Sequence, residues 1–197
     1  SADQQTRWRE LRVKLNEAGV SLIEGDGLSD AERTWLDGYF VEQIFPVLTP
    51  LAVDPAHPFP FLPNGSLALV LHLFGIEDGD VLRALLPLPS QVERFTRLPG
   101  PTIRFLPLEE FVLLFLDHIF PGFRMETHGI FRVIRDSEME IDEESEDLVR
   151  VFETALKRRR RGVLIRLEVS DAMPEEVLDF VRDGLKASAD DVFRLEG

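Results

Sequence analysis

The chain has 197 residues, 44% of them hydrophobic and 29% charged, so it is long and apolar enough to fold around its own core. Its 22 basic and 36 acidic residues give a formal charge of −14, which disfavours binding to nucleic acid, anionic membranes or free polyanions. The absence of cysteine excludes disulfides, zinc–thiolate sites and thiol nucleophiles. No stretch approaches the roughly 20 apolar residues that span a bilayer, and no signal peptide precedes the first helix. We therefore expect a cytoplasmic protein without a transmembrane segment.

Two helices are predicted at the N-terminus. Residues 3–18 show apolar residues at helical spacing and are followed by Gly19 as a stop signal. A second helix has a good N-cap at Ser29 or Asp30 and is ended by Pro46. Since two amphipathic helices cannot bury their apolar faces alone, we expect them to come from a helical bundle.

A proline-rich segment follows at residues 44–64, IFPVLTPLAVDPAHPFPFLPN, which holds six of the thirteen prolines. Proline fixes φ and removes a backbone donor, so this segment cannot be one helix or a central strand. It is nevertheless too apolar for a solvated linker. We expect it to lie against the core of its own domain or against a neighbouring domain.

After the proline-rich segment, the spacing at which apolar residues recur changes from 3.6 to 2 residues, which indicates strands. Asp78-Gly79 is a hairpin signal between two apolar runs, and short strands should follow. Pro107 is predicted to open a single, strongly apolar helix that ends before Pro121-Gly122. The four predicted strands cover residues 67–74, 81–88, 93–98 and 102–106.

The last third of the chain alternates strands and helices. FRMET and HGIFRVIRD (129 onward) are predicted as strands, an acidic run then leads into a helix ending at KRRRRG, and GVLIRLEV (162–169) is a strand. Met173-Pro174 opens a further helix, and residues 191–195 form a last strand. This order predicts an α+β fold: a two-layer domain with helices on a mixed, mostly antiparallel sheet, preceded by two helices from a bundle.

The charged clusters have structural explanations. Seven acidic residues between 138 and 147 begin a helix that Arg158 to Arg161 end, so both clusters complement the helix dipole. The acidic spacing lacks the pattern of a calcium loop. No glycine-rich phosphate motif and no nucleophile elbow is present. We therefore predict no catalytic, cofactor-binding or metal site in this chain.

The four histidines show no paired metal-ligand spacing. His72 alternates within an apolar strand and His118 closes the apolar helix, so both are predicted to be structural. His128 could in principle accept a phosphoryl group or act as a base, but the sequence offers it no partner.

The strand HGIFRVIRD places an arginine on each face together with apolar residues. These arginines could pair with acids of the same chain, such as Glu168, or could hold a neighbouring domain or partner chain. Our specific prediction is that an interface forms from a set of residues on this strand and in the proline-rich segment: His57, Phe59, Phe61, Asn64, Arg132 and Arg135.

Several segments resemble the middle, or head, domain of the long bacterial polyphosphate kinases, which phosphorylate themselves on histidine. The first is LTPLAVDPAHPFPFLPN, and six others follow in the same order: ALLPLPSQVERFTRLPG, RFLPLEEFVLLFLDHIFPGF, HGIFRVIRDSEMEIDEE, LKRRRRGVLIRLEV, MPEEV and DVFRLEG. The resemblance assigns residues 47–197 to the middle domain and residues 1–46 to the end of the family's helical N-terminal domain.

The resemblance implies a parent enzyme that transfers the terminal phosphate of ATP to polyphosphate, reversibly and with magnesium. It also implies that the phosphorylated histidine and most ATP and metal contacts lie in C-terminal catalytic domains absent from this chain. No catalytic residue can therefore be carried over to a position here. The implied partners are those catalytic domains and a second subunit, with polyphosphate reached only through the intact enzyme and any membrane association arising only through the parent.

Three functional hypotheses follow. The first is a non-catalytic head-domain fragment that serves dimerisation and positioning of other domains. The second is a stand-alone protein-interaction module of the same fold, which would lack the catalytic domains in its reading frame. The third is an enzyme that uses His128, which would require an oriented base and an anion cradle that the sequence does not show.

Overall fold

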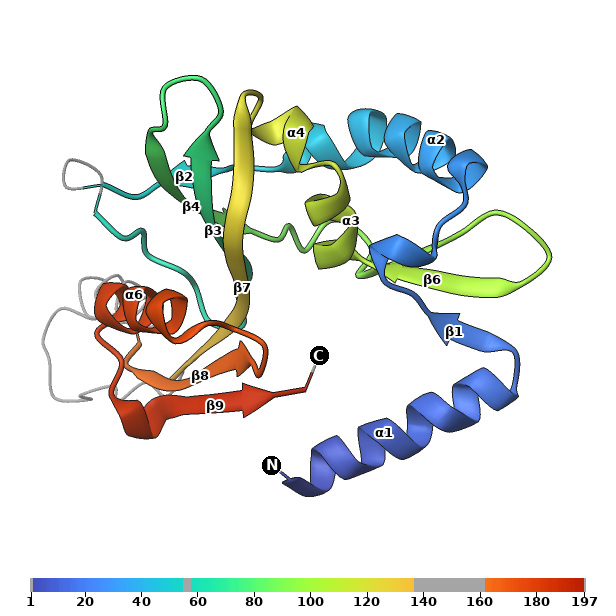
Figure 1. Ribbon diagram of the computed structural model, residues 1–197. Helices are drawn as coiled ribbons and strands as arrows, with labels where there is room; N and C mark the ends of the chain where they lie inside the picture. Colours follow the sequence, from blue (N-terminus) through green and yellow to red (C-terminus); the bar gives the residue numbers. More distant parts are fainter. Residues whose placement is uncertain (1, 55–57, 137–161, 197) are drawn as a thin grey trace, which may run out of the picture. The chain divides into compact units, whose positions relative to one another are not determined.

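The computed structural model describes residues 2–54, 58–136 and 162–196, and the chain divides into two compact units that interleave along the sequence (Figure 1). The first unit comprises residues 1–50, 74–80 and 88–124; the second comprises residues 51–73, 81–87 and 125–197. Each unit combines helices with its own sheet region, which confirms the predicted α+β class. The predicted acidic helix and its KRRRRG end lie outside the described residues.

The first unit begins with the two predicted helices, α1 (Ala2–Glu17) and α2 (Asp30–Tyr39). Of the two predicted N-cap residues, Ser29 caps α2, since its hydroxyl accepts from the Glu32 amide and the Glu32 carboxylate accepts from the Ser29 amide. Beyond α2 the chain continues as a π-helical turn, Phe40–Ile44, and a 3₁₀ turn that contains Pro46. The α-helix therefore ends earlier than predicted, at Tyr39, and Pro46 lies within the 3₁₀ turn that closes the helical segment at Val47.

The apolar helix predicted from Pro107 is two short helices rather than one. Pro107 is the last residue of a strand and the N-cap of α3 (Leu108–Leu114) instead of its first helical residue. Phe115 then leaves helical geometry, with φ −118° and ψ 30°, before α4 (Leu116–Ile119). The prediction of a single helix was wrong because the apolar pattern continues across a backbone break that no Gly or Pro marks.

A three-stranded sheet, in the order β1-β6-β5, completes the first unit. Its strands are β1 (Val20–Leu22), β5 (Phe95–Arg97) and β6 (Ile103–Pro107). β6 pairs with β1 in parallel and with β5 antiparallel. The sequence predicted the last two strands but not β1, whose three residues are too few to show a period.

The second unit is built on a six-stranded sheet in the order β2-β4-β3-β7-β8-β9. FRMET and HGIFRVIRD form one continuous strand, β7, rather than two. The strands are β2 (Leu51–Ala52), β3 (Leu67–Gly75), β4 (Val81–Pro87), β7 (Phe123–Arg135), β8 (Leu164–Ser170) and β9 (Val192–Leu195). β2–β4 and β7–β8 are antiparallel, whereas β8 and β9 are parallel and are joined by α6 (Glu175–Leu185), as a parallel pair requires.

The core of the second unit lies between α6 and one face of this sheet. Val177, Leu178 and Val181 of α6 are buried there, as their helical spacing predicted. The sheet side is formed by alternate residues of β3, β4, β7 and β8: Ala68, Val70, Leu85, Phe131, Val133, Leu167 and Val169.

The proline-rich segment packs against this core, one of the two placements that its composition allowed. Leu62 is 2% exposed within the core, and Phe59 packs beside it. The Phe59 ring lies directly over Gly184 of α6, where a Cβ would fall 2.1 Å from a ring carbon. Gly184 is thus required for close packing of the segment on the helix.

We predict that Gly184→Ala destabilises the protein by about 1–3 kcal/mol, because the new methyl group displaces the Phe59 ring. Gly38→Ala is the matched control, since Gly38 is also helical but has nothing within 4 Å of a Cβ. The control should be neutral or stabilise by up to about 1 kcal/mol through helix propensity. Urea unfolding measures both, and equal effects of the two substitutions would contradict the packing described.

Candidate interaction surface

Arg135 of β7 binds the proline-rich segment to the sheet. Its Nε donates to the Leu62 carbonyl at 2.9 Å, and its Nη1 donates to the Gly162 carbonyl at 3.0 Å. The guanidinium lies 4.7 Å from the centre of the Phe61 ring, and the Arg135 amide donates to Asn64 Oδ1 at 2.9 Å. Burial lowers the pKa of Arg135 from its ordinary value. This arginine therefore serves the fold by satisfying main-chain carbonyls.

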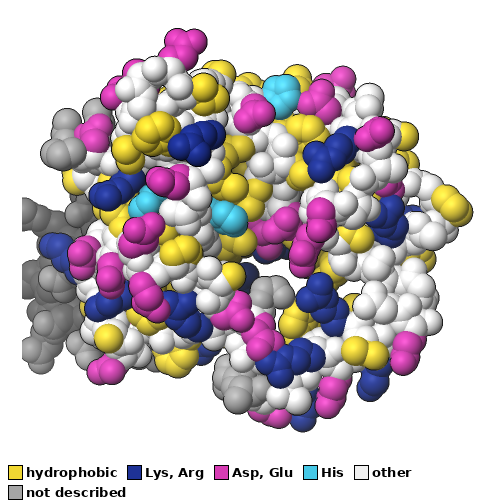
Figure 2. Space-filling model, in the orientation of Figure 1, with side chains coloured by type: hydrophobic (Ala, Val, Ile, Leu, Met, Phe, Trp, Pro, Cys, Tyr) yellow, Lys and Arg dark blue, Asp and Glu magenta, His cyan; other side chains and the backbone are white. Residues whose placement is uncertain are grey.

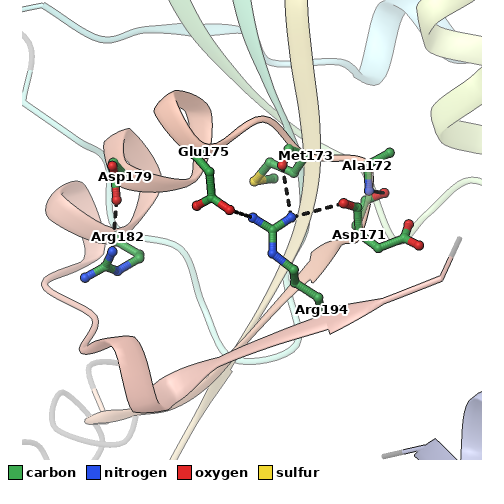
Figure 3. A network of polar contacts seen from close by, with 8 residues as sticks. Asp171, Ala172, Met173, Glu175, Asp179, Arg182 and Arg194 are labelled. Atoms are coloured by element: carbon green, nitrogen blue, oxygen red, sulfur yellow. Dashed lines mark hydrogen bonds and ion pairs between the residues drawn. The ribbon is translucent and has the colours of Figure 1, made fainter.

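Arg194 of β9 plays the same kind of role at the start of α6 (Figure 3). Its Nη1 donates to the carbonyls of Asp171 and Met173, at 3.1 and 3.0 Å, and its Nη2 lies 2.6 Å from Glu175 Oε1. The planar guanidinium thus spans the turn that leads from β8 into the helix.

The ring of Phe180, on α6, collects three contacts from separate segments. Its centroid lies 5.8 Å from that of Phe59 and 5.7 Å from that of His72, and the Arg83 guanidinium carbon lies 5.1 Å from it. His72 is 8% exposed, and its Nε2 has no hydrogen-bond partner. His72 is a packing residue, as the sequence predicted.

Burial lowers the pKa of His72 below its ordinary 6.5, and the nearby charge of Arg83 lowers it further, while Glu176 and Glu126 act in the opposite direction. Burial likewise lowers the pKa of His128. Both rings are therefore held neutral in the folded state at pH values where the unfolded chain already takes up protons.

We predict that the free energy of unfolding falls as the pH is lowered from 6.5 toward the folded-state pKa values, because the unfolded state binds more protons in that window. His72→Leu should reduce this fall, since it removes one of the two depressed groups and the buried orphan nitrogen. The measurement is the difference between wild type and His72→Leu in denaturant unfolding from pH 7 to pH 5. A difference that does not change with pH would contradict it.

Arg132 and Arg166 lie on neighbouring strands beside one carboxylate. Arg132 Nη1 is 3.8 Å from Glu168 Oε2, and Arg166 Nε is 3.0 Å from Glu168 Oε1. The Arg166 guanidinium also lies 4.2 Å from the centre of the Phe193 ring, which is 40% exposed. The sequence allowed Arg132 to pair either with an acid of the same chain or with a neighbouring domain or partner chain. Glu168 is such an acid of the same chain.

The predicted interface residues occupy three places in the second unit. Phe61, Asn64 and Arg135 lie together, Phe59 packs on α6, and Arg132 lies beside Glu168. His57 lies outside the described residues. Their role toward a partner stays a prediction. Sequence reasoning missed Arg166, Phe180 and Phe193, although the alternation of polar and apolar residues in LIRLEVS could have placed Arg166 and Glu168 on one face.

Among the described residues, no group of three His, Cys, Asp or Glu side chains could hold a metal ion. His118 Nε2 lies 2.7 Å from Asp37 Oδ1 at the surface of the first unit. Within the described part of the chain, no helix is long and apolar enough to cross a membrane. Figure 2 shows acidic and basic side chains interspersed over the visible face.

Comparison with known proteins gives a consistent result. The family model for the polyphosphate kinase middle domain matches residues 31–197. The polyphosphate kinase of Erythrobacter litoralis is 42% identical over 185 residues, which cover 94% of this chain and 26% of that protein. The polyphosphate kinase of Prochlorococcus marinus is 40% identical over 206 residues, which cover 98% of this chain and 29% of that protein.

The crystal structure of polyphosphate kinase from Porphyromonas gingivalis has the same fold, with a TM-score of 0.75 at 23% identity. That likeness covers 98% of this chain and 28% of the crystallised one. The chain thus spans between a quarter and a third of the length of the relatives it matches.

Proposed function

This chain belongs to the polyphosphate kinase family, whose middle domain it contains, and we propose that it is a non-catalytic part of such an enzyme. In this role it positions the neighbouring domains and contributes to dimerisation. The parent enzyme would transfer the terminal phosphate of ATP to polyphosphate in the cytoplasm. ATP, magnesium and polyphosphate would bind to C-terminal catalytic domains of that enzyme, whereas residues 31–197 match its middle domain.

The observation that supports this proposal most is that three arginine side chains bind groups of the chain itself. Arg135 and Arg194 each donate to two main-chain carbonyls, and Arg104 donates to the Gly27 carbonyl and lies 2.6 Å from the Glu32 carboxylate. A phosphate-binding site needs guanidinium or backbone donors that converge on empty space. These three arginines instead hold the chain in its own conformation, which supports an architectural role.

His72 supports the same proposal. Phosphoryl transfer to histidine requires an accessible ring nitrogen together with groups that stabilise the anion. Nε2 of His72 is buried, so this ring nitrogen is not accessible to a phosphoryl donor.

We predict that Phe61→Ser and Arg132→Glu, placed in the enzyme with all its domains, weaken the dimer or lower the rate of polyphosphate synthesis by roughly tenfold. Both side chains are exposed, so neither substitution should unfold the domain. Arg97→Glu is the control, because Arg97 is an exposed arginine on a short strand of the other unit.

Light scattering over a dilution series measures the dimer, and ATP-dependent polymer formation measures the rate. If both variants match the wild type in mass and rate at every concentration, the positioning and dimerisation role is wrong.

A further inference from the structure

The β7–β8–β9 part of the large sheet is buried on one face only. Toward α6, Val133, Leu167 and Val169 are at most 2% exposed. β3, by contrast, is buried on both faces, since its opposite face carries the fully buried Leu69 and Leu71. The other side of β7–β8–β9 therefore differs from the rest of the sheet.

The residues on that side follow from the alternation along each strand and from the pairing register. Arg132 pairs with Glu168, and Glu168 pairs with Phe193 on the other edge of β8. We call this side the open face; its members are partly or largely exposed and comprise Ile130, Arg132, Ile134, Arg166, Glu168, Phe193 and Leu195.

On the open face, two arginine side chains share one glutamate, so positive charge exceeds negative charge there. Glu168 lies between Arg132 and Arg166, at 3.8 and 3.0 Å; the first distance is too long for a hydrogen bond, and Arg166 Nε has no hydrogen-bond partner. Within the described residues, these contacts and the Phe193 ring are what the two guanidiniums touch. Arg166 Nε is buried, so a further acceptor would meet the remaining donors of the two guanidiniums, and a carboxylate matches a guanidinium fork bidentately.

The charges select among possible occupants. A second copy of the same face would bring four arginines against two glutamates, which is repulsive. A long polyanion would meet two arginines but also the field of a chain with a charge of −14. A protein surface with carboxylates beside an apolar patch satisfies both arginines and covers the exposed Phe193 ring.

We propose that the open face docks a carboxylate-bearing surface of another domain of the same polyphosphate kinase chain. This inference rests on the proposed function and names the surface through which the middle domain holds its neighbour. The source of the occupant follows from the comparisons: the chain matches a middle domain and covers 26–29% of its relatives, so most of such an enzyme lies outside it.

Site-resolved modification of arginine with phenylglyoxal, read by mass spectrometry, tests the proposal on native side chains. The modification rates of Arg132 and Arg166 are compared between the 197-residue chain and the enzyme with all its domains, with free arginine added as a standard. Both rates should fall by roughly tenfold in the whole enzyme. Phe193→Ser in the whole enzyme should restore them, because the apolar anchor is lost.

The matched control is Phe95→Ser, since Phe95 is a 42% exposed ring on β5, an edge strand like β9, and should leave the protection intact. Equal rates in the chain and the whole enzyme would overturn the proposal. Protection that disappears on dilution would indicate a second copy, and protection that appears only with added polyphosphate would indicate a polyanion; either result would also overturn it. Protection in the whole enzyme, with neither Phe61→Ser nor Arg132→Glu changing its mass or rate, would refute the proposed function while leaving the docking intact.

Discussion

The packing of α6 on the large sheet is the interaction on which the second unit depends: Val177, Leu178 and Val181 are buried in the core, and Phe180 is partly buried beside them. Phe180 contacts Phe59 from the proline-rich segment, His72 from β3 and Arg83 from β4. An aromatic ring with three such neighbours contributes both buried area and specific geometry. The neighbouring Phe59 ring explains why Gly184 must lack a side chain, and burial together with the charge of Arg83 explains why His72 can stay neutral in the core. Arg135 and Arg194 add to the apolar contacts by donating hydrogen bonds to the carbonyls of Leu62 and Met173, each of which precedes a proline.

Much of the fold could be predicted because its signals are local. The alternation in residues 67–74 and the cap at Ser29 each depend on neighbouring residues, and both appear where the sequence placed them. β1 was missed because three residues show no period and its only reason to be extended is a parallel pairing with β6, some 80 residues away. The break at Phe115 was missed because the apolar pattern does not reveal it.

The candidate surface was only partly accessible from the sequence. The alternation of residues correctly assigned Arg132 and Arg135 to one strand. It could not predict their different contacts, because Arg135 follows a register shift and donates to the carbonyls of Leu62 and Gly162. The pairing of Arg166 with Phe193 depends on a parallel register between two strands joined by a helix, which periodicity cannot supply. Function lies in such sites rather than in the fold, so the family assignment leaves the role of each arginine to be tested.

The central claim is that this chain organises a polyphosphate kinase and does not itself transfer phosphate. The most direct measurement is incubation of the purified 197-residue chain with γ-labelled ATP, magnesium and polyphosphate, followed by a search for acid-labile label on the protein and label in the polymer. The account predicts label in neither, whereas the enzyme with all its domains should label both. Acid-labile label on any of the four histidines of this chain would contradict it.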